Sequence, residues 1–204
     1  MQTCPTIEQD LKDSLLKYCP VIVLASQSPN RKALLESAGM KVSTKPQNIN
    51  EICGLSQPAA VVKTLSRQKL DSYLNSPDFD KNIPAVGIDT LVYLEDKLIG
   101  KPQDTKEAYE IIKSLSGKSH QVYSGLSMYI PNKGVKTQEV ITNVHFINLS
   151  KEQINWYVDT GDCMGAAGAY KIQSNGYKLI DNIDGSFSNI IGIPFEKMLE
   201  FLQE

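Results

Sequence analysis

The sequence predicts an α/β fold built on a mixed, twisted sheet with flanking helices. Helical and strand-like patterns alternate along most of the 204 residues, which is typical of this class. Several strand-like runs are also joined by tight turns, at residues 95–97 and 131–134. Tight turns connect antiparallel neighbours, whereas parallel strands need a long crossover. The pattern therefore favours a mixed sheet over a purely parallel one.

Residues 21–35, VIVLASQSPNRKALL, predict a strand, a polar turn and a helix. Residues 21–24 form a short apolar run rich in β-branched side chains, as in buried strands. Ser28 is the expected N-cap, and Pro29 suits the first helical turn. Free backbone N–H groups and Arg31 at such a helix start could hold an anion such as phosphate. An ordinary capped helix with no ligand explains the same pattern about equally well.

The later segments continue the alternation. Further helices are predicted to start at Pro58, Asp104, Ser150 and Pro194, and further strands to cover residues 42–45, 120–130 and 135–149. Residues 169–173 and 177–183 are predicted to form a hairpin, because Asn-Gly is a strong signal for a two-residue turn. We expect a single domain over residues 1–204, with residues 1–19 as an N-terminal helical extension.

Composition restricts the class of protein. Hydrophobic residues make up 41% and charged residues 22%, as in ordinary globular proteins. A net charge of −2 gives no basic footprint for a nucleic acid polymer, and no apolar run has membrane-spanning length. The four cysteines form no CxxC pair and the chain has two histidines, so no zinc site can be written. Free thiols and a polar N-terminus predict a cytoplasmic protein.

Common catalytic motifs are missing from the chain. It has no GxxxxGK[ST], GxGxxG or GxSxG pattern, so a Walker-type NTPase, a Rossmann dehydrogenase and an α/β-hydrolase lack support. Asp89 follows an apolar strand and directly precedes Thr90. A carboxylate there is costly to bury unless it is paired, hydrogen-bonded or bound to a cation. A structural Asp that caps the local turn is the alternative.

The motifs of this chain resemble those of the Maf family of nucleotide pyrophosphatases. LASQSPNRKALL, at residues 24–35, is similar to the opening motif of that family. Family-like segments follow in order: GIDTLVYLEDKLIGKP, LSGKSHQVYSG, MGAAGAYKIQ and GSFSNIIGIP. The resemblance covers about residues 21–202 and implies an elongated Maf/ITPase-like α/β fold split by a deep cleft. It also implies a homodimer and a suggested link to cell division.

The resemblance implies a metal-dependent hydrolase that converts a nucleoside triphosphate, standard or modified, to the monophosphate and pyrophosphate. In that interpretation Asp89 is the general base or water-orienting carboxylate. Glu51 and Asp89 would share a divalent cation, Mg²⁺, Mn²⁺ or Co²⁺. The residues expected to contact the substrate are Ser26, Ser28, Arg31, Lys69, Thr90, Lys101 and Gln173, the last of them near the base. Removal of non-standard nucleotides would be the biological role.

The chain departs from the family pattern in several places, which leaves alternatives open. Asn30 stands where the family has arginine, Asp162-Cys163 replaces an acid-Pro pair, and Ala166 replaces a lysine. Asn30 and the AGAYKIQ segment lean toward a subgroup acting on 7-methyl-GTP, whereas the DT pair and GSFSNIIG lean toward dTTP and UTP. These departures also allow a nucleotide-binding regulator of cell division and septum formation with little turnover.

Overall fold

The computed structural model describes residues 6–46 and 53–204 and contains a seven-stranded sheet. The strands are β1 Val21–Leu24, β2 Lys41–Thr44, β3 Ala85–Leu94, β4 Lys97–Ile99, β5 Ser119–Ile130, β6 Gly134–Phe146 and β7 Ile180–Asp184. Their order is β2-β1-β3-β5-β6-β7, and β4 pairs with β3. β1 is parallel to β2 and β3, whereas the β3–β4 and β6–β7 pairs are antiparallel. The predicted mixed sheet is therefore confirmed.

Helices alternate with these strands, as expected. They are α1 Gln9–Tyr18, α2 Pro29–Ser37, α3 Pro58–Leu74, α4 Thr105–Leu115, α5 Lys151–Asp159, α6 Phe187–Ile190 and α7 Phe195–Gln203, with two 3₁₀ segments, η1 Ala167–Ala169 and η2 Asn175–Leu179. The predicted caps are present, because Ser28, Asp104 and Ser150 each accept a bond from the first turn of their helix. Among the described residues, no helix has the length and apolar character needed to cross a membrane.

The chain divides into two compact units. The first consists mainly of Thr90–Tyr123 and Ile141–Ile191, and the second of Ile7–Asp89, Ser124–Val140 and Gly192–Glu204. β3, β5 and β6 each contribute residues to both units. The interpretation of residues 1–204 as one domain stays a prediction.

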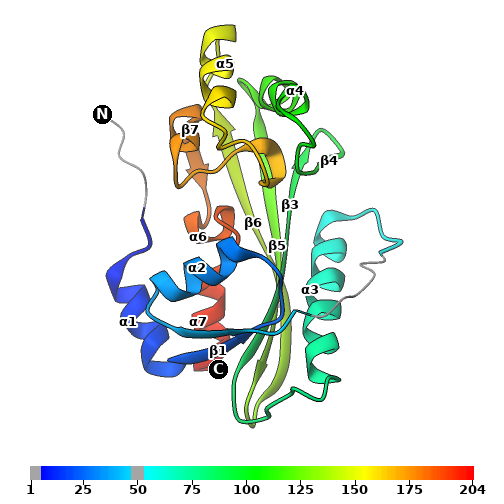
Figure 1. Cartoon of the computed structure of the whole chain (residues 1–204), viewed down its shortest axis with the longest axis vertical. Helices are drawn as coiled ribbons and strands as arrows, with labels where there is room; N and C mark the ends of the chain where they lie inside the picture. The colour runs from blue at the N-terminus through cyan, green and yellow to red at the C-terminus, as the bar shows by residue number, and fades with distance from the viewer. Residues whose placement is uncertain (1–5, 47–52) are drawn as a thin grey trace. The chain divides into compact units, whose positions relative to one another are not determined.

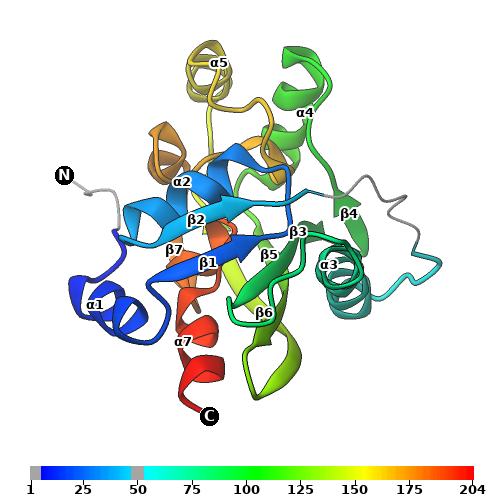
Figure 2. The same cartoon turned by 60° about the horizontal axis from the view of Figure 1, so that its bottom comes forward.

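The second unit contains β1, β2 and the helices α1, α2, α3 and α7 (Figure 1). α1 packs on α7 through the fully buried Leu15, so the amphipathic helix expected near the N-terminus is present. Figure 2 shows β1 and β2 lying side by side beneath α2. Leu70 and Tyr73 of α3 pack against Val23 and Ala85 of the neighbouring strands. This packing holds α3 against the part of the sheet that carries Asp89 at the end of the unit.

The first unit is built around a larger apolar cluster. Ile112 and Leu115 of α4, Tyr157 of α5 and Phe146 of β6 meet in it. α4 and α5 contact one another, and α4 also contacts η1. The contact between α4 and η1 packs the segment 161–179, which carries Gln173, against the apolar cluster.

The hairpin predicted around Asn175-Gly176 is wrong. Residues 175–179 form the 3₁₀ segment η2, and β7 pairs with β6 instead. The backbone N–H of Gly176 donates to the carbonyl of Lys171 at 3.1 Å. A Cβ atom at Gly176 would lie 2.4 Å from that same oxygen, so the backbone passes too closely for a larger residue. Asn-Gly therefore belongs to a compact turn closed by a hydrogen bond to Lys171, five residues before Gly176, and does not form a two-residue hairpin turn.

Candidate functional site

The polar turn after β1 and the carboxylate of Asp89 both lie just beyond the point where β1 and β3 stop pairing. β1 is parallel to β3, with Leu24 opposite Val86, and the N–H of Ala25 donates to the Val86 carbonyl at 2.9 Å. Parallel neighbours have their carboxyl ends at one edge. Ser26 follows β1, whereas Asp89 lies within β3 and not after a strand as expected from the sequence, because β3 continues beyond it. Both residues are 8% exposed and lie just beyond the paired part of the two strands.

The turn is held by its own hydroxyl groups. The N–H of Ser28 donates to Oγ of Ser26 at 3.2 Å, and the N–H of Arg31 donates to Oγ of Ser28 at 3.4 Å. Nε of Arg31 donates to the carbonyl of Gly192 at 3.1 Å, which ties α2 to the start of the last segment of the unit. The predicted N-cap is therefore confirmed, and Arg31 is fixed at the start of the helix. This is the geometry of an anion-accepting helix start, although it also suits a purely structural cap.

Asp89 forms a short ion pair with Lys69 of α3. Nζ of Lys69 lies 2.6 Å from Oδ1 of Asp89, and the two side chains are 13% and 11% exposed. The second carboxylate oxygen, Oδ2, is buried and has no hydrogen-bond partner among the described residues. A buried carboxylate oxygen left without a partner is costly. It therefore offers a position where a cation or a water molecule would be stabilised.

The metal prediction falls partly outside the structure. Glu51 lies outside the described residues. Among the residues that the structure does describe, no group of three or more His, Cys, Asp or Glu side chains could hold a metal ion. Asp89 is therefore the one member of the predicted pair that the structure describes. Its buried Oδ2, which has no hydrogen-bond partner among the described residues, is an oxygen ligand of the kind that hard divalent cations prefer.

The other predicted substrate residues belong to the first unit. Thr90 is half-buried and follows Asp89 directly in β3, whereas Lys101 and Gln173 are exposed. The carbonyl of Gly100 accepts a bond of 3.1 Å from the N–H of Gly168, so the backbone before Lys101 is tied to the segment 161–179. Gly168 has φ +72°, a conformation that favours glycine. Lys101 and Gln173 therefore belong to two segments joined by a backbone hydrogen bond.

Asp162 holds the segment 161–179 together. Its Oδ2 accepts bonds from the backbone N–H and the side-chain Nδ2 of Asn175, at 3.1 and 2.9 Å. Burial raises the pKa of Asp162, but the bonds from Asn175 outweigh it and the net pKa is below its usual range. The hydroxyl of Tyr157 accepts a further bond, of 3.0 Å, from the N–H of Lys171. Asp162, which departs from the family pattern, thus stabilises the segment that carries Gln173. No local sequence signal indicated this role.

His120 and Tyr170 form a second buried contact to the same segment. Nε2 of His120 lies 2.9 Å from the Tyr170 hydroxyl, and both rings pack edge-on against Phe146. His120 is 1% exposed, and burial, with a smaller contribution from His145, lowers its pKa to about 4. His120 is therefore a neutral core residue at physiological pH.

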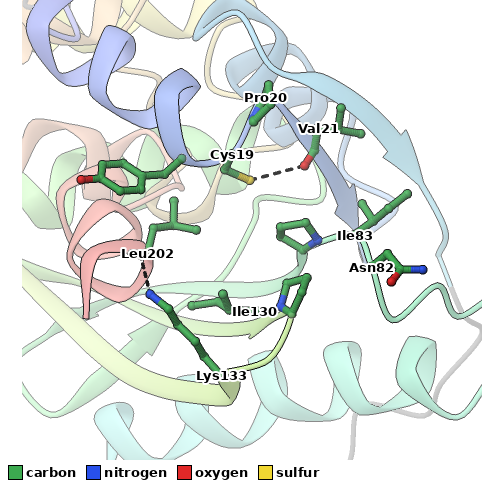
Figure 3. Close-up of a pocket in the computed structure, with 11 residues that line it drawn as sticks. Cys19, Pro20, Val21, Asn82, Ile83, Ile130, Lys133 and Leu202 are labelled. Atoms are coloured by element: carbon green, nitrogen blue, oxygen red, sulfur yellow. Dashed lines mark hydrogen bonds between the residues drawn. The ribbon is translucent and has the colours of Figure 1, made fainter.

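A separate pocket lies at the opposite end of β1 (Figure 3). Its volume is about 550 Å³, and its lining includes Cys19, Val21 and Lys133. Nζ of Lys133 donates to the carbonyl of Leu202, and Sγ of Cys19 donates to the carbonyl of Val21. Burial raises the pKa of Cys19 to about 12, so it stays a thiol. None of the predicted site residues that the structure describes lines this pocket.

Comparison with known proteins adds a family to this geometry. A family model described as Maf-like protein matches residues 21–204. A dTTP/UTP pyrophosphatase of Aquifex aeolicus is 36% identical over 183 residues, covering 90% of this chain and 94% of that protein. A dTTP/UTP pyrophosphatase of Ruminiclostridium cellulolyticum is 38% identical, covering 90% and 96%. Among solved structures, a HAM1 protein from Coxiella burnetii matches with TM-score 0.47 and 14% identity, covering 90% of this chain and 98% of that one.

Proposed function

Because the chain belongs to the Maf-like protein family, we propose that it is a nucleoside triphosphate pyrophosphatase that releases a nucleoside monophosphate and pyrophosphate. The observation that carries the proposal in this structure is the buried carboxylate of Asp89. One of its oxygens is held by Lys69 and the other has no hydrogen-bond partner among the described residues. Such an oriented carboxylate can accept a proton from a water molecule.

Lys69 fixes the orientation of Asp89 in this mechanism. Its ammonium lies 2.6 Å from Oδ1, so Oδ2 remains as the oxygen that would accept a proton from the reacting water. An ammonium has three N–H donors, so the same group can also contact a phosphate oxygen, as the sequence predicts. Lys69 would thus hold the carboxylate and help to neutralise the charge that develops on the leaving pyrophosphate.

Ser26, Ser28 and Arg31 would bind the phosphate chain at the start of α2. The cap of Ser28 and the Arg31–Gly192 bond already fix this turn, so little ordering is needed when an anion binds. Thr90 and Lys101 would add further phosphate contacts, and Gln173 would contact the base. These roles follow from the family motif matched residue by residue.

A divalent cation would satisfy the buried Oδ2 of Asp89, which has no hydrogen-bond partner among the described residues. Asp89 and Glu51 would hold it, with Mg²⁺, Mn²⁺ and Co²⁺ as the candidates, and bound there it would neutralise phosphate charge. The chain's own residues would still orient the water and the triphosphate. The requirement is tested by chelator treatment and by direct cation titration of wild type and Asp89→Asn.

The relatives favour dTTP and UTP as the first substrates to test. Both relatives described above are named dTTP/UTP pyrophosphatases, which matches the DT pair at Asp89-Thr90. The subgroup acting on 7-methyl-GTP is retained as the competing substrate class because of Asn30. The alternative of a regulator with little turnover is not favoured, since the relatives are named as enzymes.

The experiment is a nucleotide panel with purified protein. dTTP, UTP, 7-methyl-GTP and the common nucleotides are incubated with each cation, and the products are separated. We expect monophosphate and pyrophosphate, with dTTP or UTP fastest, and no turnover with chelator. Nucleoside diphosphate and inorganic phosphate as main products would contradict the proposed chemistry. Size-exclusion chromatography of the same sample tests the homodimer, and cell fractionation tests the cytoplasmic location.

A further inference from the structure

α3 approaches the sheet at backbone distance where two strands carry glycine. A Cβ atom at Gly87 of β3 would lie 2.3 Å from the Ser66 carbonyl oxygen and 2.8 Å from the Leu70 nitrogen. A Cβ atom at Gly125 of β5 would lie 2.0 Å from the Val62 carbonyl oxygen. Non-bonded heavy atoms are most stable at about 3.5–4.0 Å, so neither site has room for any side chain.

This approach lies directly beside the ion pair. Gly87 and Asp89 are two residues apart in β3 and therefore point to the same face of the sheet. Ser66 and Lys69 are three residues apart in α3, and residues at this spacing are neighbours on one helix face. The helix face that contacts Gly87 is thus the face that delivers Lys69 to Asp89.

A buried hydroxyl chain ties α3 to β5 at the same place. Oγ of Ser66 lies 3.0 Å from Oγ of Ser127, and Oγ of Ser127 lies 2.9 Å from Oγ1 of Thr137. Ser66 and Ser127 are fully buried. Ser127 and Gly125 share one face of β5, so the close approach and the hydroxyl contact act on one side of α3.

We propose that Gly87 and Gly125, together with Ser127 through its hydroxyl contact to Ser66, are positioning residues that set the distance between Lys69 and Asp89. They touch neither the substrate nor the reacting atoms. They act by letting α3 lie close enough to the sheet for Nζ to reach Oδ1 at 2.6 Å. The consequence for turnover rests on the proposed function, whereas the consequence for the ion pair does not.

Gly125→Ala is the informative substitution, because Gly125 lies on a different strand from Asp89. The added methyl group would clash with backbone atoms of α3, which cannot rotate away, so the helix must move by roughly 1 Å. A misplacement of that size can cost about 10²-fold in rate. We therefore expect kcat to fall about 10²-fold. KM should rise by a smaller factor, since Lys69 moves with α3 whereas Ser26, Ser28 and Arg31 keep their contacts.

The decisive measurement is a double-mutant cycle that needs no activity. Lys69→Met, Asp89→Asn and the double variant are unfolded with denaturant, in the wild-type and in the Gly125→Ala background. Side chains in contact commonly show a coupling of about tenfold in the unfolding equilibrium constant. We expect this coupling in the wild-type background and its loss in Gly125→Ala. An unchanged coupling would overturn the proposal, even if Gly125→Ala lowers stability.

Two further variants keep the test decisive. Leu15→Ala, in α1 and fully buried, is the control for lost stability, because it removes core volume far from α3 and should leave the coupling intact. If Gly125→Ala does not fold, Ser127→Ala replaces it, since it removes the hydroxyl contact to Ser66 without adding an atom. It should weaken the coupling, and an unchanged coupling would again refute the proposal. If wild type hydrolyses no nucleotide, the proposed function fails, while the coupling still decides the positioning role.

Discussion

The two regions that carry the predicted substrate residues are held in opposite ways. In the second unit, α3 lies against β3 and β5 through backbone contacts that only glycine allows, and one ion pair joins them. In the first unit, the segment 161–179 is held by hydrogen bonds in which the side chains of Asp162 and Tyr157 accept, and by the contact between His120 and Tyr170. The region around α3 is therefore sensitive to added atoms. The region of the segment 161–179 is sensitive to the removal or protonation of polar groups. In the proposed function, the region around α3 holds the reacting carboxylate, and the segment 161–179 carries the residue that would contact the base.

Asp89→Asn gives the largest expected effect on turnover, and it acts in the region around α3. Asn keeps the size of the side chain but removes the charge that a general base and a cation ligand need. We expect turnover to fall by about 10³-fold or more, with nucleotide still bound. The measurements are steady-state kinetics, a nucleotide titration and a melting curve on the same preparation. Asp71→Asn, an exposed carboxylate on α3, is the control and should keep normal turnover.

Arg31→Ala is expected to have the next largest effect. Its guanidinium is fixed beside the turn by the bond to Gly192, so its charge is preorganised for phosphate. Loss of one such contact typically costs about 10²–10³ in rate. Lys32→Ala removes a neighbouring exposed charge, paired with Glu36, and serves as the matched control. Equal turnover in both variants, with both folded, would reduce Arg31 to a structural cap.

His120 should make the free energy of unfolding pH-dependent, through its contact to the segment 161–179. Its folded pKa of about 4 lies below the ordinary value of 6.5. Between these values the unfolded chain binds more protons, so stability is complete above pH 6.5 and is lost as the pH falls toward 4. The expected loss is about 3 kcal/mol, measured by denaturation across this range. His120→Phe should flatten this step, whereas His145→Gln should largely keep it. A step of the same size in His120→Phe would assign it to other groups.

Asp162→Ala has the smallest expected effect and releases the segment that carries Gln173. Two bonds from Asn175 are lost at a partly exposed site, so we expect about 1 kcal/mol of destabilisation. The KM for nucleotide should rise, while kcat should change little. Asp181→Ala, an exposed carboxylate at the start of β7, is the control. A large fall in kcat with unchanged KM would contradict the division of tasks between the regions.

Neighbouring residues in the sequence were enough to predict the strand, turn and helix that begin the region containing α3. The strand, the turn and the Ser28 cap follow from neighbouring residues, and each is present. The Lys69–Asp89 pair was not foreseen, because the two residues are 20 positions apart and meet only when α3 lies on β3. Glycine within a strand can indicate a close backbone approach. Gly87 and Gly125 carried that signal, but the sequence does not show which element approaches them.

The structure of the segment 161–179 was predicted less well. Asn175-Gly176 indicated a hairpin, but the bonds to Asp162 and Lys171 fold it into η2 instead. Asp162 itself looked like a departure that could weaken activity, and its clamp role depends on a partner 13 residues away. Contacts at this range depend on how the whole segment packs, which hydrophobic periodicity does not encode.

The most direct test of the account is to compare nucleotide preference in Asp89→Asn and Gln173→Ala. The central claim is that Asp89 carries the chemistry and Gln173 contributes to the choice of base. We measure kcat/KM for dTTP, UTP, dCTP and GTP in wild type and both variants. The account predicts that Asp89→Asn lowers all four values by a similar factor, whereas Gln173→Ala changes the ratios between them. A uniform loss in Gln173→Ala, or near-normal rates in Asp89→Asn, would contradict it.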